Sequence, residues 1–132
     1  GFPRTRAQAE GLDRLLSAFG STLNGVFLLV VPREVLISRI AGRRVCRQCG
    51  AVYHVVNLPT RVDGICDRCG GPTYQRPDDN ETTVANRLDV YERQTRELVD
   101  LYRARGILHE VDAAGSPDAT RDQIARWLAT WA

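Results

Sequence analysis

The stretch "CRQCGAVYHVVNLPTRVDGICDRCGG", residues 46–71, holds all four cysteines of this 132-residue sequence. They form two C-x-x-C pairs, Cys46 with Cys49 and Cys66 with Cys69, and a glycine follows each pair. The glycine lets the backbone turn so that amide N–H groups face the sulfurs. Two such turns supply the ligands of a tetrahedral thiolate zinc site. Because four thiolates close the coordination shell, the pattern predicts a structural Zn²⁺ rather than a catalytic one.

Two other uses of the cysteines fit the spacing less well. Two disulfides would suit a small secreted domain, but paired C-x-x-C turns are more typical of a metal site. A redox dithiol needs one pair and leaves the second unexplained. His54 is a fifth candidate ligand, and we expect it to be a structural residue beside Tyr53 because the cysteines already suffice.

The segment between and around the cysteine pairs has the pattern of a small β module. Residues 51–56 predict a short strand, residues 57–60 and 63–64 predict turns, and another short strand is expected near Tyr74. About 35 residues bury too little apolar surface to fold alone. We therefore expect the metal to supply much of the folding free energy of this module.

The sequence before the module predicts two helices separated by a strand. Thr5 is placed to cap a helix over 6–19, and Pro32 opens a second helix over 33–44 that ends near Gly42. Between them, the apolar run Val26–Val31 suits a strand covered on both faces, as in a parallel sheet.

The sequence after the module predicts a long helix, a strand and a final helix. The long helix runs over about 80–104, with Asp78 or Asp79 as its cap. A strand is expected over 107–112 and a helix over 116–131. The order is typical of an α/β fold with the zinc module inserted in one crossover.

The expected sheet has too few strands for the apolar run at its centre. A strand covered on both faces needs neighbours, and the sequence offers one. The chain also opens at Gly1 on a turn and contains no Met. From these features we expect a fragment that lacks an N-terminal half.

Composition and charge narrow the classes of function. The sequence is 43% hydrophobic and 26% charged, as is usual for a globular domain. It has no apolar run long enough to span a membrane. Its net charge of +2 does not by itself indicate nucleic-acid binding, and all 18 basic residues are Arg.

Four arginines gather where the module joins its flanking helices. Arg39 and Arg43 lie where the second helix enters the module, Arg76 lies at its exit, and Arg87 lies further along the next helix. Any one of them could be an exposed residue balanced by nearby acids. Together they favour a polyphosphate site, because guanidinium groups bind phosphate oxygens through paired N–H donors.

Several motifs together resemble one known family. They are "GFPRT" with Gln8 three residues on, "RIAGRRVCRQCGAVYH", "CDRCGG", "YQRPDDNETTVANRL" and "ILHEVD". In this order they are similar to the C-terminal part of a bacterial adenylate kinase of the long form with a zinc-bearing lid. The resemblance covers essentially all 132 residues.

The resemblance implies a fold, a reaction and partners. The fold would be a partial P-loop nucleoside monophosphate kinase core, a parallel sheet with flanking helices, into which a small β zinc-binding lid is inserted. Residues 1–42 would belong to the core with the AMP-binding turn, residues 43–77 to the lid, and residues 78–132 to the C-terminal part of the core. The reaction would be ATP + AMP = 2 ADP with Mg²⁺, in a cytoplasmic and monomeric complete enzyme.

The resemblance also implies roles for individual residues. AMP would be bound by Gly1, Phe2, Pro3, Arg4, Gln8, Arg76 and Arg87. ATP would be bound by Arg39, Arg43, Val52, Tyr53 and Gly115. The catalytic residues would be Arg43, Arg76 and Arg87, which suits a reaction that depends on cationic positioning. Asp78 and Asp79 would be lid-hinge acids.

The sequence departs from the family in its missing parts. No Asp precedes Gly1 to organise Mg²⁺, and without Lys there is no P-loop of the form G-x-x-x-x-G-K-[ST]. The isolated chain is therefore expected to be inactive and to need the N-terminal half as its partner. The alternatives are a zinc-ribbon nucleic-acid-binding module and a non-catalytic interaction module. Acidic residues, and few stacking aromatics in the zinc module, argue against nucleic acid.

Overall fold

The computed structural model describes residues 1–131, which form two compact units. The first contains Gly1–Pro32 and the chain from Asp89 onward, and the second contains Arg33–Leu88. Each is described below by itself. No helix within the described residues is both long enough and apolar enough to cross a membrane.

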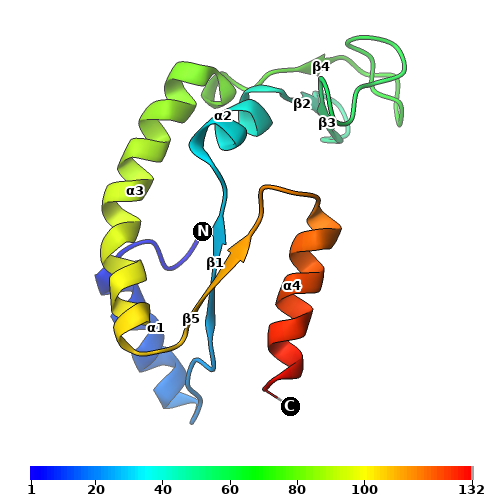
Figure 1. The fold of residues 1–132 in the computed structure, drawn as a ribbon. Helices are drawn as coiled ribbons and strands as arrows, with labels where there is room; N and C mark the ends of the chain where they lie inside the picture. The colour runs from blue at the N-terminus through cyan, green and yellow to red at the C-terminus, as the bar shows by residue number, and fades with distance from the viewer. Residues whose placement is uncertain (132) are drawn as a thin grey trace. The chain divides into compact units, whose positions relative to one another are not determined.

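The first unit is built on two parallel strands, β1 (Val26–Val30) and β5 (Leu108–Asp112). Val26 lies opposite Leu108 and Val30 opposite Asp112, so the two strands are in full register. Helix α1 (Arg6–Ala18) and the second half of α3 (Glu81–Ala104) lie on one side of the pair, and α4 (Pro117–Ala129) lies on the other (Figure 1). The expected parallel sheet with flanking helices is confirmed.

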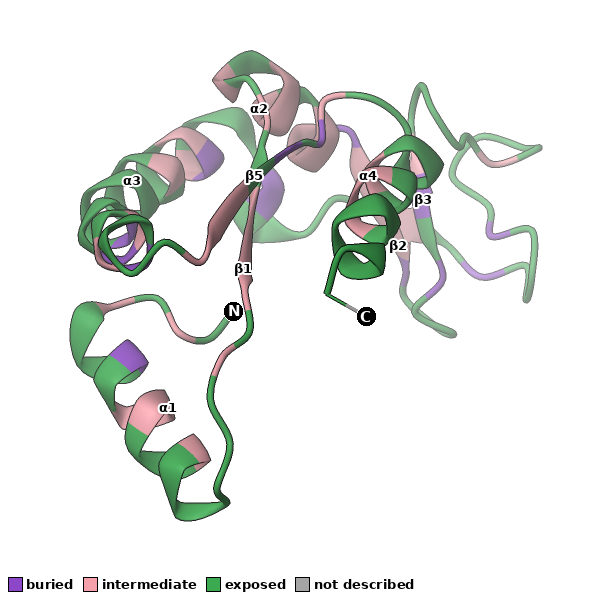
Figure 2. Ribbon diagram, turned by 60° about the horizontal axis from the view of Figure 1, so that its bottom comes forward, coloured by how far each residue is buried: buried purple, intermediate pink, exposed green. Residues whose placement is uncertain are grey.

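The two sides of this sheet are packed differently. On the side of α1 and α3, a buried cluster is made by Ala9, Leu98 and Tyr102. On the other side α4 has no buried residue (Figure 2), and its contact with the strands is aromatic. The ring centroids of Trp127 and His109 are 4.3 Å apart.

The first unit also leaves apolar surface open. Among residues 1–131, β1 and β5 pair only with each other. Leu29 and Val30 of β1 keep 53% and 45% of their surface exposed. A groove of about 400 Å³ is lined mainly by apolar side chains from α1, both strands and α3. Thr95 Oγ1 and Tyr102 Oη belong to residues on this groove, are buried, and have no hydrogen-bond partner within the described chain.

The second unit is a small antiparallel sheet joined to helical segments. Helix α2 (Arg33–Ala41) leads into β2 (Arg43–Cys46), which is the central strand of the order β3-β2-β4. The outer strands are β3 (Val52–His54) and β4 (Thr73–Tyr74). The 3₁₀ turn η1 (Pro77–Asp79) then precedes α3. The expected small β module is confirmed.

Three local expectations were wrong. Residues 43 and 44 belong to β2 rather than to the preceding helix, because they pair with Tyr53 and His54. The strand expected over 51–56 is confined to β3. The cap of α3 is neither Asp78 nor Asp79: Asn80 Oδ1 accepts a hydrogen bond from the Thr83 amide at 2.9 Å.

Candidate metal centre and arginine cluster

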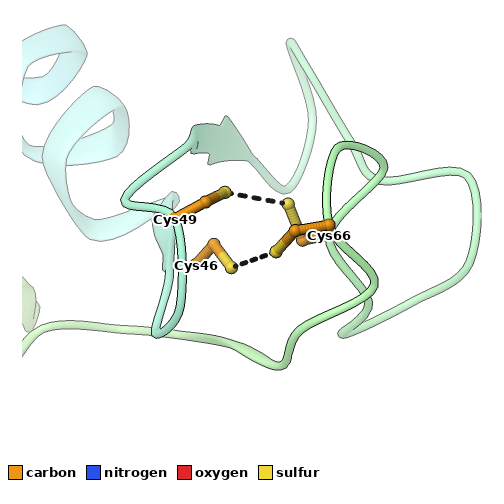
Figure 3. Close-up of side chains that lie close together, drawn as sticks. Cys46, Cys49 and Cys66 are labelled. Atoms are coloured by element: carbon orange, nitrogen blue, oxygen red, sulfur yellow. Dashed lines mark hydrogen bonds between the residues drawn. The ribbon is translucent and has the colours of Figure 1, made fainter.

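The two C-x-x-C turns bring all four cysteine sulfurs together. One sulfur from each turn pairs with one from the other: Cys46 Sγ lies 3.4 Å from Cys69 Sγ, and Cys49 Sγ lies 3.6 Å from Cys66 Sγ. All four lie within 4.8 Å of one another. Figure 3 shows Cys46 and Cys49 on one loop with their sulfurs directed towards the opposite loop, which carries Cys66.

These distances fit a tetrahedral thiolate site. With Zn–S bonds of about 2.3 Å, the sulfurs of a regular tetrahedron are about 3.8 Å apart. The observed separations of 3.4 and 3.6 Å are close to this value. They are much longer than a disulfide bond of about 2.05 Å. The four cysteines can therefore hold a metal ion as a closed set of ligands.

The backbone of each C-x-x-C turn directs amide groups at the cysteine sulfurs. Gly50 and Gly70 adopt φ values of 72° and 73°, a conformation that favours glycine. The amides of Gln48 and Arg68 each point at the first sulfur of their own pair, with N–S distances of 3.4 Å. Such N–H···S contacts stabilise thiolates and orient them towards a metal.

Hydrogen bonds within the cluster shift the ionisation of individual thiols. The Tyr53 hydroxyl, above all, lowers the pKa of Cys66 to about 6, although burial opposes this. The Gly71 amide lowers the pKa of Cys69, but its thiol neighbour Cys46, burial and the other thiols together raise it to about 12. Four thiolates therefore do not form readily without a cation between them, so metal binding must release protons.

Two residues between the cysteine pairs have defined structural roles. Tyr53 is 8% exposed, and its hydroxyl lies 3.2 Å from Cys66 Sγ and 2.9 Å from the Asp67 amide. His54 lies outside the cysteine cluster. Its Nδ1 accepts hydrogen bonds from the Val56 and Asn57 amides, and its Nε2 lies 3.1 Å from the Ser38 carbonyl oxygen. The expectation that His54 is a structural residue is confirmed.

The His54 ring also explains the glycine at the end of α2. A Cβ atom at Gly42 would overlap the imidazole, so only glycine leaves room for the ring there. In addition, the Val55 amide donates to the Gly42 carbonyl at 2.9 Å. The end of α2 is thus joined to the end of β3 by a backbone hydrogen bond and by the side chain of His54.

The arginines at the base of the module converge on one carboxylate. Arg43 donates from Nε and Nη2 to the two oxygens of Asp79, at 2.9 and 2.6 Å. Arg76 does the same at 3.1 and 3.3 Å. The Asp79 side chain is completely buried, whereas those of Arg43 and Arg76 are 31% and 44% exposed.

This arrangement fixes the charge of Asp79 and joins the two ends of the module. Arg43 and then Arg76 lower the pKa of Asp79 to about 2, against the effect of burial. Gln75 donates to the carbonyls of Ala41 and Asp79, at 2.9 and 3.2 Å. The entry and exit strands are therefore held to each other at their base.

The other predicted nucleotide residues belong to both units. In the second unit, Arg39 lies in the last turn of α2, and Arg87 Nη1 lies 3.4 Å from the Asp78 carbonyl oxygen. Val52 lies on β3 with 57% of its surface exposed. In the first unit, Gly115 lies in the loop between β5 and α4.

The N-terminal turn belongs to the first unit and forms a helix cap. The Thr5 hydroxyl accepts from the Gln8 amide at 3.3 Å, and Gln8 Oε1 accepts from the Arg4 amide at 2.7 Å. This reciprocal pattern resembles a capping box and confirms Thr5 as the cap. Gln8 therefore has a local structural contact besides its predicted role with AMP, and Gly1, Phe2 and Pro3 precede the cap.

Sequence reasoning missed two contacts of this site. The motif "RPDD" places Arg76 three residues before Asp79, a spacing that permits an ion pair, but nothing local indicates that Arg43 joins it. The contact of the Tyr53 hydroxyl with Cys66 depends on a loop 13 residues further along the chain, and no sequence signal predicts it.

Comparisons with known proteins agree with this geometry. Residues 43–78 match the family described as adenylate kinase, active site lid. The chain is 58% identical over 116 residues to an adenylate kinase of Carboxydothermus hydrogenoformans, a match that covers 88% of this chain and 54% of the relative. It is 50% identical over 128 residues to an adenylate kinase of Syntrophobacter fumaroxidans and 53% identical over 128 residues to one of Moorella thermoacetica.

The two longer matches each cover 97% of this chain, but only 60% and 59% of the relatives. The chain therefore spans between half and two thirds of the length of these relatives. The sequence matches, together with a four-cysteine β module at the matched lid, show that the chain is similar to the C-terminal portion of bacterial adenylate kinases.

Proposed function

We propose that this chain supplies the zinc-bearing lid and the C-terminal part of the core of an adenylate kinase, which transfers a phosphoryl group from ATP to AMP. An oxygen of the AMP phosphate forms a bond to the γ-phosphorus of ATP as the bond to the β–γ bridging oxygen breaks, giving two ADP. Mg²⁺ would accompany ATP, Zn²⁺ would occupy the four cysteines, and the complete enzyme would be a cytoplasmic monomer.

The observation that carries this proposal is the convergence on Asp79 of Arg43 and Arg76, which both lie inside the matched lid segment; Asp79 directly follows that segment. One buried carboxylate holds two guanidinium groups close together despite their mutual repulsion. Each uses Nε and one Nη on Asp79, so three of its five N–H donors remain for other acceptors. Two partly exposed cations positioned in this way suit the charge of a phosphoryl group in transfer.

The remaining nucleotide contacts are proposals from the family resemblance. Arg87 would join Arg76 on the transferred phosphoryl and on AMP, and Gly1, Phe2, Pro3, Arg4 and Gln8 would bind AMP. Arg39, Val52, Tyr53 and Gly115 would contact ATP. The phosphate-binding lysine would come from the N-terminal portion that the relatives possess, because this chain contains no Lys.

A chimaera tests the proposed catalytic role. The N-terminal portion of the Carboxydothermus relative is fused ahead of residue 1, and ADP formation is followed in a coupled assay. We expect Arg87→Ala to lower kcat by about 100-fold or more while the KM for ATP changes little, because the cation acts on charge that develops during transfer.

Arg93→Ala is the matched control, since Arg93 lies on the same helix and donates from Nε to the carbonyl of Asp89. This variant should retain the parent kcat. An Arg87→Ala chimaera with unchanged kcat would overturn the assignment of Arg87. A parent chimaera that folds and binds metal but forms no ADP would overturn the proposed activity.

A further inference from the structure

We propose that the hydroxyl of Tyr53 is a positioning group for the metal centre, which donates a hydrogen bond to the Cys66 thiolate and holds this ligand for the ion. The inference concerns metal binding alone and does not depend on the proposed kinase activity. It gives Tyr53 a side-chain role beyond the backbone contact with ATP suggested by the family resemblance.

The direction of the hydrogen bond follows from the second partner of the hydroxyl. The Asp67 amide, 2.9 Å from Tyr53 Oη, can only donate, so the oxygen accepts this bond with a lone pair. The hydroxyl proton remains available for Cys66 Sγ at 3.2 Å. A thiolate can only accept, and therefore Tyr53 is the donor in the ionised, metal-binding form of the site.

The contact distinguishes Cys66 from the other ligands. Within the described residues, it is the one cysteine whose sulfur lies next to a hydroxyl group, and it also accepts from the Arg68 amide. Cys66 and Tyr53 are 2% and 8% exposed, so water cannot readily replace the hydroxyl if it is removed. The loss would leave a buried thiolate short of one donor and the Asp67 amide without its acceptor.

The same hydroxyl fixes the second cysteine turn to strand β3. Tyr53 lies on β3 and pairs with Arg44 of β2, whereas Cys66 and Asp67 belong to the loop between β3 and β4. The buried cluster of this unit is made by Cys46, Ala51, Tyr53 and Cys66, so the contact joins two of its members. Partners that orient a metal ligand in this way commonly raise metal affinity by about 10- to 100-fold.

The test removes one oxygen atom and keeps the ring. Tyr53→Phe is compared with the parent chain for Zn²⁺ affinity, measured by competition with a chromophoric chelator, and for its Co²⁺ spectrum. We expect Zn²⁺ affinity to fall by about 10- to 100-fold. We also expect the sulfur-to-cobalt charge-transfer band to move to lower energy, because the lost hydrogen bond no longer stabilises the sulfur lone pair.

Tyr74→Phe is the matched control. Tyr74 is a second tyrosine of the same sheet, and its ring lies 3.9 Å from the Arg47 guanidinium rather than against a cysteine. We expect this variant to keep the parent affinity and spectrum. A Tyr53→Phe chain that binds neither metal while Tyr74→Phe binds both would also support the role, since one oxygen distinguishes the residues. Unchanged affinity and an unshifted band in Tyr53→Phe would overturn the proposal.

Discussion

At the level of single residues, Asp79 is a buried carboxylate of the second unit that is paired with two arginines. Its pKa is lowered to about 2 from an ordinary value of 3.8, with Arg43 as the main cause. The stabilisation from this carboxylate is fully present above pH 3.8 and is lost as the pH falls through 2. Because the two arginines are partly exposed, solvent screening reduces the contribution to about 1–2 kcal/mol.

We therefore expect Asp79→Asn to lower the free energy of unfolding by about 1–2 kcal/mol at pH 7. The difference from the parent chain should narrow as the pH falls below 4, because the parent then loses the same charge. Urea unfolding of both chains across pH 7 to 3 measures this difference and cancels effects of pH that the two proteins share. Asp78→Asn is the control, since the Asp78 side chain is exposed and should change little. A difference that stays constant below pH 4 would contradict the charge-based explanation.

At the level of elements, the cysteine cluster takes the place of a large hydrophobic core in the second unit. The buried cluster there has four members, two of which are cysteines of the candidate metal site. Large apolar side chains such as Val56 and Leu58 are 76% and 59% exposed, so burial contributes little to this module. We therefore expect the ordered structure of β2, β3 and β4 to depend strongly on a bound metal ion.

We expect elemental analysis to find one Zn²⁺ per chain, bound by sulfur alone. Chelation, or Cys46→Ser, should accelerate amide hydrogen exchange throughout β2, β3 and β4 and leave β1 and β5 unchanged. Hydrogen exchange followed by mass spectrometry resolves these segments. Freshly prepared protein with two disulfides and no metal would contradict the assignment.

At the scale of the whole molecule, the first unit has unpaired apolar surface that a partner can cover. β1 has the composition of a strand covered on both faces, but Leu29 and Val30 are about half exposed. Nearby, the groove contains the buried hydroxyls of Thr95 and Tyr102 without partners among residues 1–131. The relatives possess further length that could supply both strands and hydrogen-bond partners.

We expect the chain alone to form no ADP and to aggregate readily, because the open strand edge invites pairing. A separately produced N-terminal portion of the Carboxydothermus relative should form a 1:1 complex with it and restore ADP formation. Sedimentation and the coupled assay measure the two effects. Leu29→Asp should weaken the complex, whereas Leu128→Asp, which changes a half-exposed residue of α4, should not. ADP formation by the chain alone, free of host kinase, would refute the need for a partner.

Much of the local structure was predictable because its causes lie within a few residues. Thr5 and Ser116 cap α1 and α4, because their hydroxyl oxygens accept hydrogen bonds from the amides three residues further along the chain. The apolar run at Val26–Val30 pairs in parallel with β5, as its composition indicates. The C-x-x-C turns bend at Gly50 and Gly70, whose positive φ values belong to the turn itself.

The errors arose where distant residues compete for the same backbone or side chain. Local propensity extends the second helix through Arg43 and Arg44, but pairing with β3 turns these residues into strand β2. Asp79 has the composition of a helix cap, yet two arginines bind its carboxylate and Asn80 takes the cap instead. An ion pair with two guanidinium groups provides more favourable contacts than a single amide bond.

The four-cysteine cluster, and the order of helices and strands outside the β module, could be predicted from the sequence because each depends on residue type and on spacing along the chain. The folded structure was needed to show that Arg43 and Arg76 share Asp79 and that Tyr53 contacts Cys66. Arg43 and Asp79 are 36 positions apart in the sequence, and Tyr53 and Cys66 are 13 positions apart. Their geometry is set by how the strands of the module pair, and no local pattern in the sequence encodes it.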